Sequence, residues 1–174
     1  MANTLDQLVE QVQKWSIDRN LNTADPMKQF DKLVEEHGEL VKGINKIDTQ
    51  VIKDSIGDMF VVITIMMQQI KGDVELAIKL MSFGDYDIST ICYVNSLNDV
   101  GNRLNEFVNE RPFDSSLFSE LQACLSNVIG MLEETAKTYN TDLTTCVQLA
   151  YDEIKDRKGK MVDGKFVKEA DLEG

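Results

Sequence analysis

Proline, cysteine and basic charge are all scarce in this chain of 174 residues, and each scarcity argues against a class of protein. Only Pro26 and Pro112 interrupt the sequence, which leaves long stretches free to form helices. The three cysteines show no CxxC spacing, which argues against a disulfide framework or a zinc site. The 18 basic and 30 acidic residues give a net charge of −12, which argues against nucleic acid or an anionic membrane as a partner.

The sequence also lacks a hydrophobic run long enough to cross a bilayer. The longest apolar run, Met59 to Met67, contains Thr64 and is too short to span a membrane. The first residues show no basic segment followed by an apolar core, so no signal peptide is predicted. With 43% hydrophobic residues the chain can build one core, and we expect a single cytoplasmic domain over residues 1–174.

Apolar residues recur at helical spacing along almost the whole chain, which predicts an all-α helical bundle. Asp25 before Pro26, and Asp48 further on, are typical helix N-caps. The third helix is apolar all round in its second half and should be buried at the centre of the bundle. The expected helices cover residues 5–19, 26–45, 49–71, 74–81, 88–108, 115–139 and 143–157, with loops at 83–87 and 111–112.

The C-terminal region differs from the rest of the chain in charge and in pattern. Six basic and two acidic residues fall between Lys155 and Lys168, a local charge of +4. Asp163 and Gly164 stand between β-type residues, which predicts a tiny β-hairpin over 161–167.

The first candidate for chemistry is the acidic segment of the second helix. Glu36 and Glu39 lie one turn apart on one side of this helix, with Glu35 beside them and Lys32 in the same sector. An acidic face opposite an apolar stripe is commonly only solvated, so this helix alone does not decide between a surface and a site.

The third helix favours a site. Asp54 and Asp58 are four residues apart and share a face, and Asp58 stands at the head of an apolar column. A carboxylate in such surroundings is costly unless it is paired or binds a metal ion. Two neighbouring helices that each offer carboxylates form the oxygen-rich surroundings that Mg²⁺ prefers.

These residues carry a family resemblance. Glu35-Glu36-x-x-Glu39, followed by a helix with Asp54-Ser-Ile-Gly-Asp58, resembles the EExxE…ExxD signature of the MazG-like, all-α nucleoside triphosphate pyrophosphohydrolases. The tail from Ala150 also resembles the end of phage- and Firmicute-type MazG-like proteins. The resemblance covers about residues 5–71 and 140–172, whereas the helical segment at about 73–140 is less family-like.

The resemblance implies an activity and roles for the residues that match. It implies hydrolysis of an NTP or dNTP to the monophosphate and pyrophosphate, with Mg²⁺ or Mn²⁺ as cofactor, in nucleotide-pool housecleaning. Glu36, Glu39 and Asp58 would hold the metal, and Glu35 would either be a further ligand or orient the attacking water. Further residues are candidates for binding the substrate, namely Lys32, Lys155, Arg157 and Trp15. Relatives form homodimers or homotetramers, so a homo-oligomer is expected.

Two points leave alternatives open. The family pattern has Glu where this chain has Ser55, so either Asp54 replaces the missing carboxylate or one metal position is weakened. Trp15 could stack on a nucleobase, although a core aromatic on an amphipathic helix is the better interpretation. The alternative functions are a catalytically silent scaffold or nucleotide-binding regulator, and a dUTP-, dCTP- or phosphoribosyl-ATP-specific member of the same superfamily.

Overall fold

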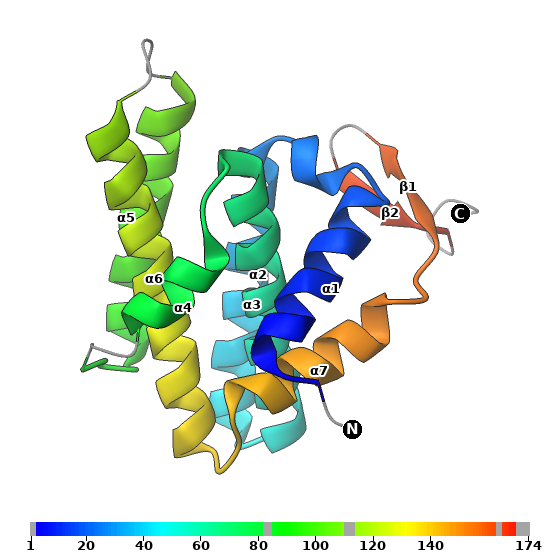
Figure 1. Cartoon of the computed structure of the whole chain (residues 1–174). Helices are drawn as coiled ribbons and strands as arrows, with labels where there is room; N and C mark the ends of the chain where they lie inside the picture. The colour runs from blue at the N-terminus through cyan, green and yellow to red at the C-terminus, as the bar shows by residue number, and fades with distance from the viewer. Residues whose placement is uncertain (1–2, 82–84, 110–113, 163–164, 170–174) are drawn as a thin grey trace.

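Aspartates cap the two helices that carry the candidate carboxylates, as the sequence predicts. The computed structural model describes residues 3–81, 85–109, 114–162 and 165–169 (Figure 1). Helix α2 (Pro26–Lys46) begins after Asp25, whose carboxylate accepts the Met27 amide, and α3 (Thr49–Ile70) begins after Asp48. A two-residue link, Ile47 and Asp48, joins these helices into an antiparallel pair, because Ile47 adopts a left-handed conformation with φ of 54°.

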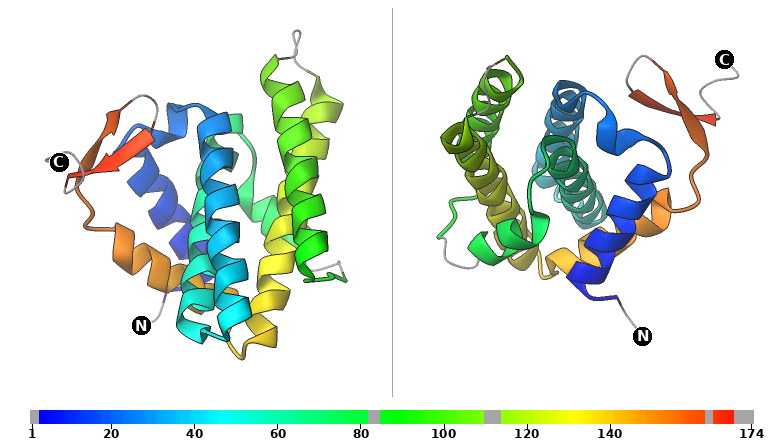
Figure 2. Two further views of the ribbon diagram at one scale, coloured as in Figure 1. Left: turned by 180° about the vertical axis from the view of Figure 1, so that it is seen from behind. Right: turned by 45° about the horizontal axis from the view of Figure 1, so that its top comes forward.

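The α2–α3 pair is the centre of the bundle, and the other elements cover two of its sides. Helices α1 (Leu5–Ile17) and α7 (Leu143–Ile154) pack against α3 and against each other. On the other side lie α4 (Val74–Met81), α5 (Thr90–Asn109) and α6 (Ser115–Thr138), with α5 against α2 and α6 against α3 (Figure 2). The less family-like segment therefore packs directly on the central pair. The all-α class is confirmed.

Helix α3 supplies much of the core, as its apolar second half predicts. Every residue from Met59 to Met67 is buried. One apolar cluster joins α3 to α2, α5 and α6, and a smaller one joins α3 to α1, α7 and the C-terminal hairpin. The charged residues of α3, namely Lys53, Asp54 and Asp58, lie in its N-terminal half and are half-buried.

Three helix boundaries differ from the sequence expectation by two residues or more. Helix α1 ends at Ile17 instead of Arg19, because Asn20 turns the chain with a φ of 58° before a 3₁₀ turn, η1 (Leu21–Thr23). Helix α7 ends at Ile154 instead of Arg157, where the Arg157 amide bonds to the Ile154 carbonyl in a tighter turn. Helix α5 begins at Thr90, two residues later than expected.

The predicted C-terminal hairpin is confirmed. Strands β1 (Gly159–Val162) and β2 (Lys165–Lys168) pair antiparallel, with Met161 opposite Phe166. The predicted turn residues Asp163 and Gly164, and the predicted break at residues 111–112, lie outside the described residues. Of the predicted loop at 83–87, residues 85–87 have no helix or strand, and 83–84 are likewise outside.

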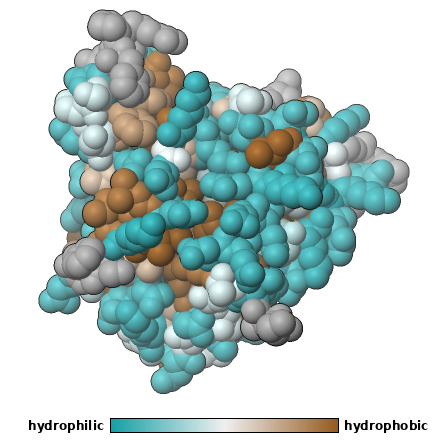
Figure 3. Space-filling view, in the orientation of Figure 1, coloured by the Kyte–Doolittle hydropathy of each residue, from teal (hydrophilic) through white to brown (hydrophobic). Residues whose placement is uncertain are grey.

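The face of the molecule drawn in Figure 3 is mostly polar, with an apolar area over α4. Figure 3 shows apolar residues gathered there, where Leu76 and Leu80 are 43% and 46% exposed. None of the helices in the described ranges combines the length and the hydrophobicity that a membrane crossing requires.

Candidate active site

The acidic edge of α2 has the arrangement that its spacing predicts. Glu36 is buried, with 8% of its surface exposed, whereas Glu35 and Glu39 are exposed. The Lys32 ammonium lies 2.9 Å from a Glu36 carboxylate oxygen and 3.0 Å from one of Glu35. Burial lowers the pKa of Lys32, but its hydrogen bonds to Glu36 and Glu35 outweigh burial and raise the pKa above its usual value. Lys32 thus neutralises part of this acidic edge.

Asp58 on α3 is the most strongly perturbed carboxyl of this region. Its pKa is raised to about 7, first by burial and then by the negative charges of Glu36, Asp54 and Glu153. The positive charge of Arg157 opposes this shift without cancelling it. Asp58 makes no hydrogen bond or ion pair with any residue that the structure describes. It is an acid whose charge lacks a direct partner.

Asp54 shares the face of Asp58 one turn earlier. Its pKa is also raised, by burial first and then by Glu153 and Glu39, again against the influence of Arg157. Ser55, at the position where the family pattern has Glu, is buried with 2% of its surface exposed. Of these two neighbours, Asp54 is therefore the one that faces the other carboxylates across helices.

A glycine in α3 allows α7 to pack close to Asp54 and Asp58. A Cβ atom built on Gly57 would lie 2.2 Å from the Cys146 carbonyl oxygen and 2.8 Å from the Ala150 Cβ. The backbones of α3 and α7 therefore approach closely at this point, which only glycine permits. One turn beyond Ala150, α7 carries Glu153, and Arg157 follows the end of the helix.

Glu153 and Arg157 form an ion pair beside the two aspartates. Arg157 was among the residues predicted from the sequence, whereas Glu153 was missed. The available signal was its position four residues before Arg157, which on a continuing helix would place both side chains on one edge. The site therefore gathers carboxylates from α2, α3 and α7 together with one guanidinium.

The donor chemistry of the cluster fits a hard divalent cation, but the ligands do not converge as they stand. All the donors are carboxylate oxygens, which Mg²⁺ prefers. Within the described ranges, no three histidine, cysteine, aspartate or glutamate side chains lie close enough together to hold a metal ion. The Lys32 ammonium lies against one Glu36 oxygen, so a metal ion would compete with Lys32 for this carboxylate.

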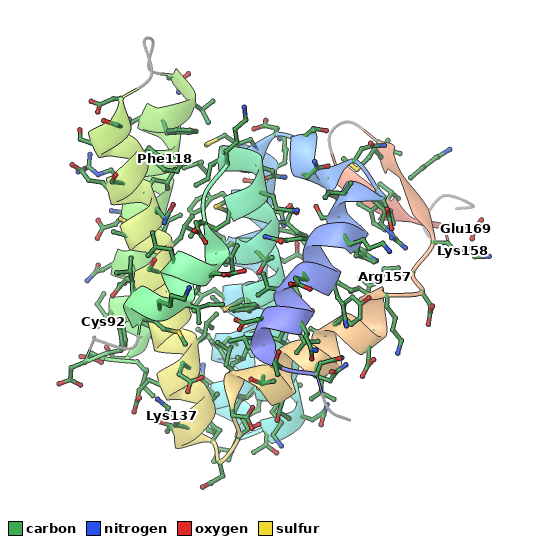
Figure 4. The ribbon with its side chains drawn as sticks, in the orientation of Figure 1. Cys92, Phe118, Lys137, Arg157, Lys158 and Glu169 are labelled. Atoms are coloured by element: carbon green, nitrogen blue, oxygen red, sulfur yellow. The ribbon has the colours of Figure 1, made fainter. Side chains whose placement is uncertain are left out.

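Two predicted substrate-binding residues lie apart from this cluster. Lys155 stands about 200° around the helix axis from Glu153 and bonds to Asp152 at 2.6 Å on the other edge of α7. Trp15 is 8% exposed, and its indole N–H donates to the Ile154 carbonyl at 2.8 Å. Trp15 is therefore a core residue. Arg157, drawn at the end of α7 in Figure 4, is close enough to Asp58 to lower its pKa.

Comparisons with known proteins give one informative similarity. No protein-family model matches the chain, and no solved structure matches it. The "Uncharacterized 18.2 kDa protein in rep-hol intergenic region" of Haemophilus phage HP1 is 52% identical over 66 residues. The match covers 37% of this chain and 40% of the phage protein. That name states no activity, so the functional argument depends on the residues of the site.

Proposed function

We propose that this chain is a Mg²⁺-dependent nucleoside triphosphate pyrophosphohydrolase with a MazG-like bundle, which converts an NTP or dNTP to the monophosphate and pyrophosphate. The observation that carries this proposal is Asp58, a carboxyl with a pKa of about 7 that faces Glu36, Asp54 and Glu153 without a direct cationic partner. A functional site is where such a costly arrangement is expected, because a cation or substrate compensates for it.

Each residue of the cluster has a role in the proposed reaction. Glu36, Glu39 and Asp58 would hold the metal. Asp54 would be a further ligand and would replace the glutamate that the family pattern has at the Ser55 position. When bound, Mg²⁺ supplies positive charge that offsets the triphosphate and stabilises the leaving pyrophosphate. Glu35 is exposed beside them and would orient the attacking water and take its proton.

The bond changes are those of a single displacement at phosphorus. The water oxygen attacks the α-phosphorus while the bond from this phosphorus to the α–β bridging oxygen breaks, and pyrophosphate leaves. Arg157, a positive charge near Asp54 and Asp58, would contact the substrate phosphates. Lys32 would exchange its bonds to Glu35 and Glu36 for the substrate phosphates when the metal binds.

A pyrophosphate-release screen tests the activity. The common NTPs and dNTPs, with dUTP, dCTP and phosphoribosyl-ATP among the substrates, are each incubated with the chain and Mg²⁺ or Mn²⁺. Pyrophosphate release that disappears in Asp58→Asn and persists in Asp31→Asn supports the proposal. The control removes the same charge from a side chain that is 59% exposed. Absence of pyrophosphate from every substrate refutes hydrolysis.

One observation favours a second candidate, a nucleotide-binding regulator or scaffold without turnover. Lys32 already neutralises Glu35 and Glu36, and no three described side chains stand ready to hold a metal. In that case, a triphosphate would bind without pyrophosphate release, which calorimetry beside the screen distinguishes. A homodimer or homotetramer, measured by light scattering, and a cytoplasmic location stay predictions.

A further inference from the structure

A hollow of about 440 Å³ lies between α1 and α7, on the opposite edge of α7 from the acidic cluster. Lys14, Trp15 and Arg19 line it from the α1 side, and Tyr151 and Lys155 line it from α7. This volume is within the range of small-molecule sites. The proposed hydrolysis uses none of these groups at this place.

Arg19 is held in a fixed position in the hollow. Its guanidinium lies 4.5 Å from the centroid of the Trp15 ring, in cation–π contact. Two of its nitrogens donate to main-chain carbonyls, at 3.3 Å to Trp15 and at 2.8 Å to Arg157. Guanidinium has five N–H donors, so donors remain for a ligand, and the entropy of ordering the side chain is already lost.

The charge of the hollow is opposite to that of the chain. It contains three cationic side chains and one acid, Asp18, whereas the whole chain carries −12. Within the described ranges, Lys14 has no hydrogen bond or ion pair. Lys155 bonds to Asp152 but keeps 43% of its side chain exposed. An anion is the ligand that this arrangement favours.

We propose that this hollow binds an organic phosphate about the size of a nucleoside monophosphate. Arginine and lysine together are the usual protein partners of phosphate oxygens. Tyr151 and the rim of Trp15 offer an apolar surface for the remainder of the ligand. The site is separate from the acidic cluster and needs no metal ion.

The chain contains its own reporter for this site, because Trp15 is its only tryptophan. Tryptophan fluorescence is followed while AMP is added in the presence of EDTA, with inorganic phosphate as a second titrant. The expected result is a saturable change with AMP at lower concentration than with phosphate. The titration involves neither metal nor turnover, so it remains informative if the proposed hydrolysis fails.

Paired lysine variants locate the binding. Lys14→Gln/Lys155→Gln should weaken AMP binding about tenfold or more, since two charge-assisted contacts are lost. Lys79→Gln/Lys137→Gln removes the same charge from exposed ion pairs on α4 and α6 and should bind AMP as the parent does. Both helices lie away from the C-terminal end of α7 (Figure 1). No saturable change with AMP, equal affinity for phosphate, or unchanged binding in the first double variant would overturn the proposal.

Discussion

Replacing Asp58 by asparagine should make folding stability less dependent on pH and should remove the response to Mg²⁺. The pKa of Asp58 is about 7 in the folded chain against 3.8 as the ordinary value. Between these two values the folded chain binds one proton more than the unfolded chain. The free energy of unfolding therefore falls as pH rises through this window and is level above it. The amide of asparagine does not titrate, so the Asp58→Asn variant lacks this loss.

The magnitude follows from the two pKa values. At about 1.4 kcal/mol per pH unit, the full difference corresponds to roughly 4 kcal/mol. Asp58 keeps some contact with solvent, which screens its charge, so we expect the variant to gain roughly 1–3 kcal/mol over the parent between about pH 5 and pH 8. At about pH 4 the two proteins should be nearly equal, because protonated aspartic acid and asparagine are similar in shape and polarity.

Urea unfolding followed by circular dichroism measures this difference in EDTA at several pH values. Asp31→Asn is the matched control, because Asp31 is exposed and its loss should leave the pH profile unchanged. Parallel profiles for the parent and Asp58→Asn would refute the argument that burial and neighbouring acids act on Asp58.

Mg²⁺ provides the second half of the test. An ion that binds only the folded chain stabilises it by about 2.7 kcal/mol at about 100 times its Kd. We expect this stabilisation in the parent above about pH 7, where Asp58 is ionised, and little of it in Asp58→Asn. Equal stabilisation of both proteins would show that the ion binds elsewhere.

Three further predictions concern the same region. Glu39→Gln should abolish pyrophosphate release in the NTP screen while leaving the melting temperature equal or higher, because a repelling charge is removed; retained turnover would exclude Glu39 as a ligand. Asp54→Asn should reduce steady-state rates heavily across a Mg²⁺ titration while Ser55→Ala changes them little; a silent Asp54→Asn, with Ser55→Glu raising the rate, would mean that a metal position is weakened. Gly57→Ala should destabilise the chain by about 2 kcal/mol or more in urea unfolding, since a backbone oxygen blocks the new methyl group; Gly38→Ala, which meets nothing within 4 Å, should stabilise it by about 0.5–1 kcal/mol.

The sequence alone was sufficient for the local structure of α2 and α3. Their aspartate caps, the proline after Asp25 and the apolar run from Met59 are signals that act within one helix, and the structure confirms them. The same holds for the carboxylate faces, because helical spacing determines which side chains share an edge.

Tertiary structure decided which elements complete these faces. The close approach of α3 and α7 at Gly57 brings Glu153 and Arg157 to Asp54 and Asp58, and a glycine in a sequence does not state which helix will fill its space. The pKa of Asp58 likewise arises from burial and from charges on three helices, most of which lie outside its own segment.

The separation of Lys155 from Arg157 has the same origin. These residues are two apart near the end of α7, and the family resemblance implied that both bind the substrate. Helix geometry and the Asp152 bond turn Lys155 towards α1, while Arg157 turns towards the aspartates of α3. Spacing along a helix assigns residues to edges, but only the packing of neighbouring helices decides what each edge meets.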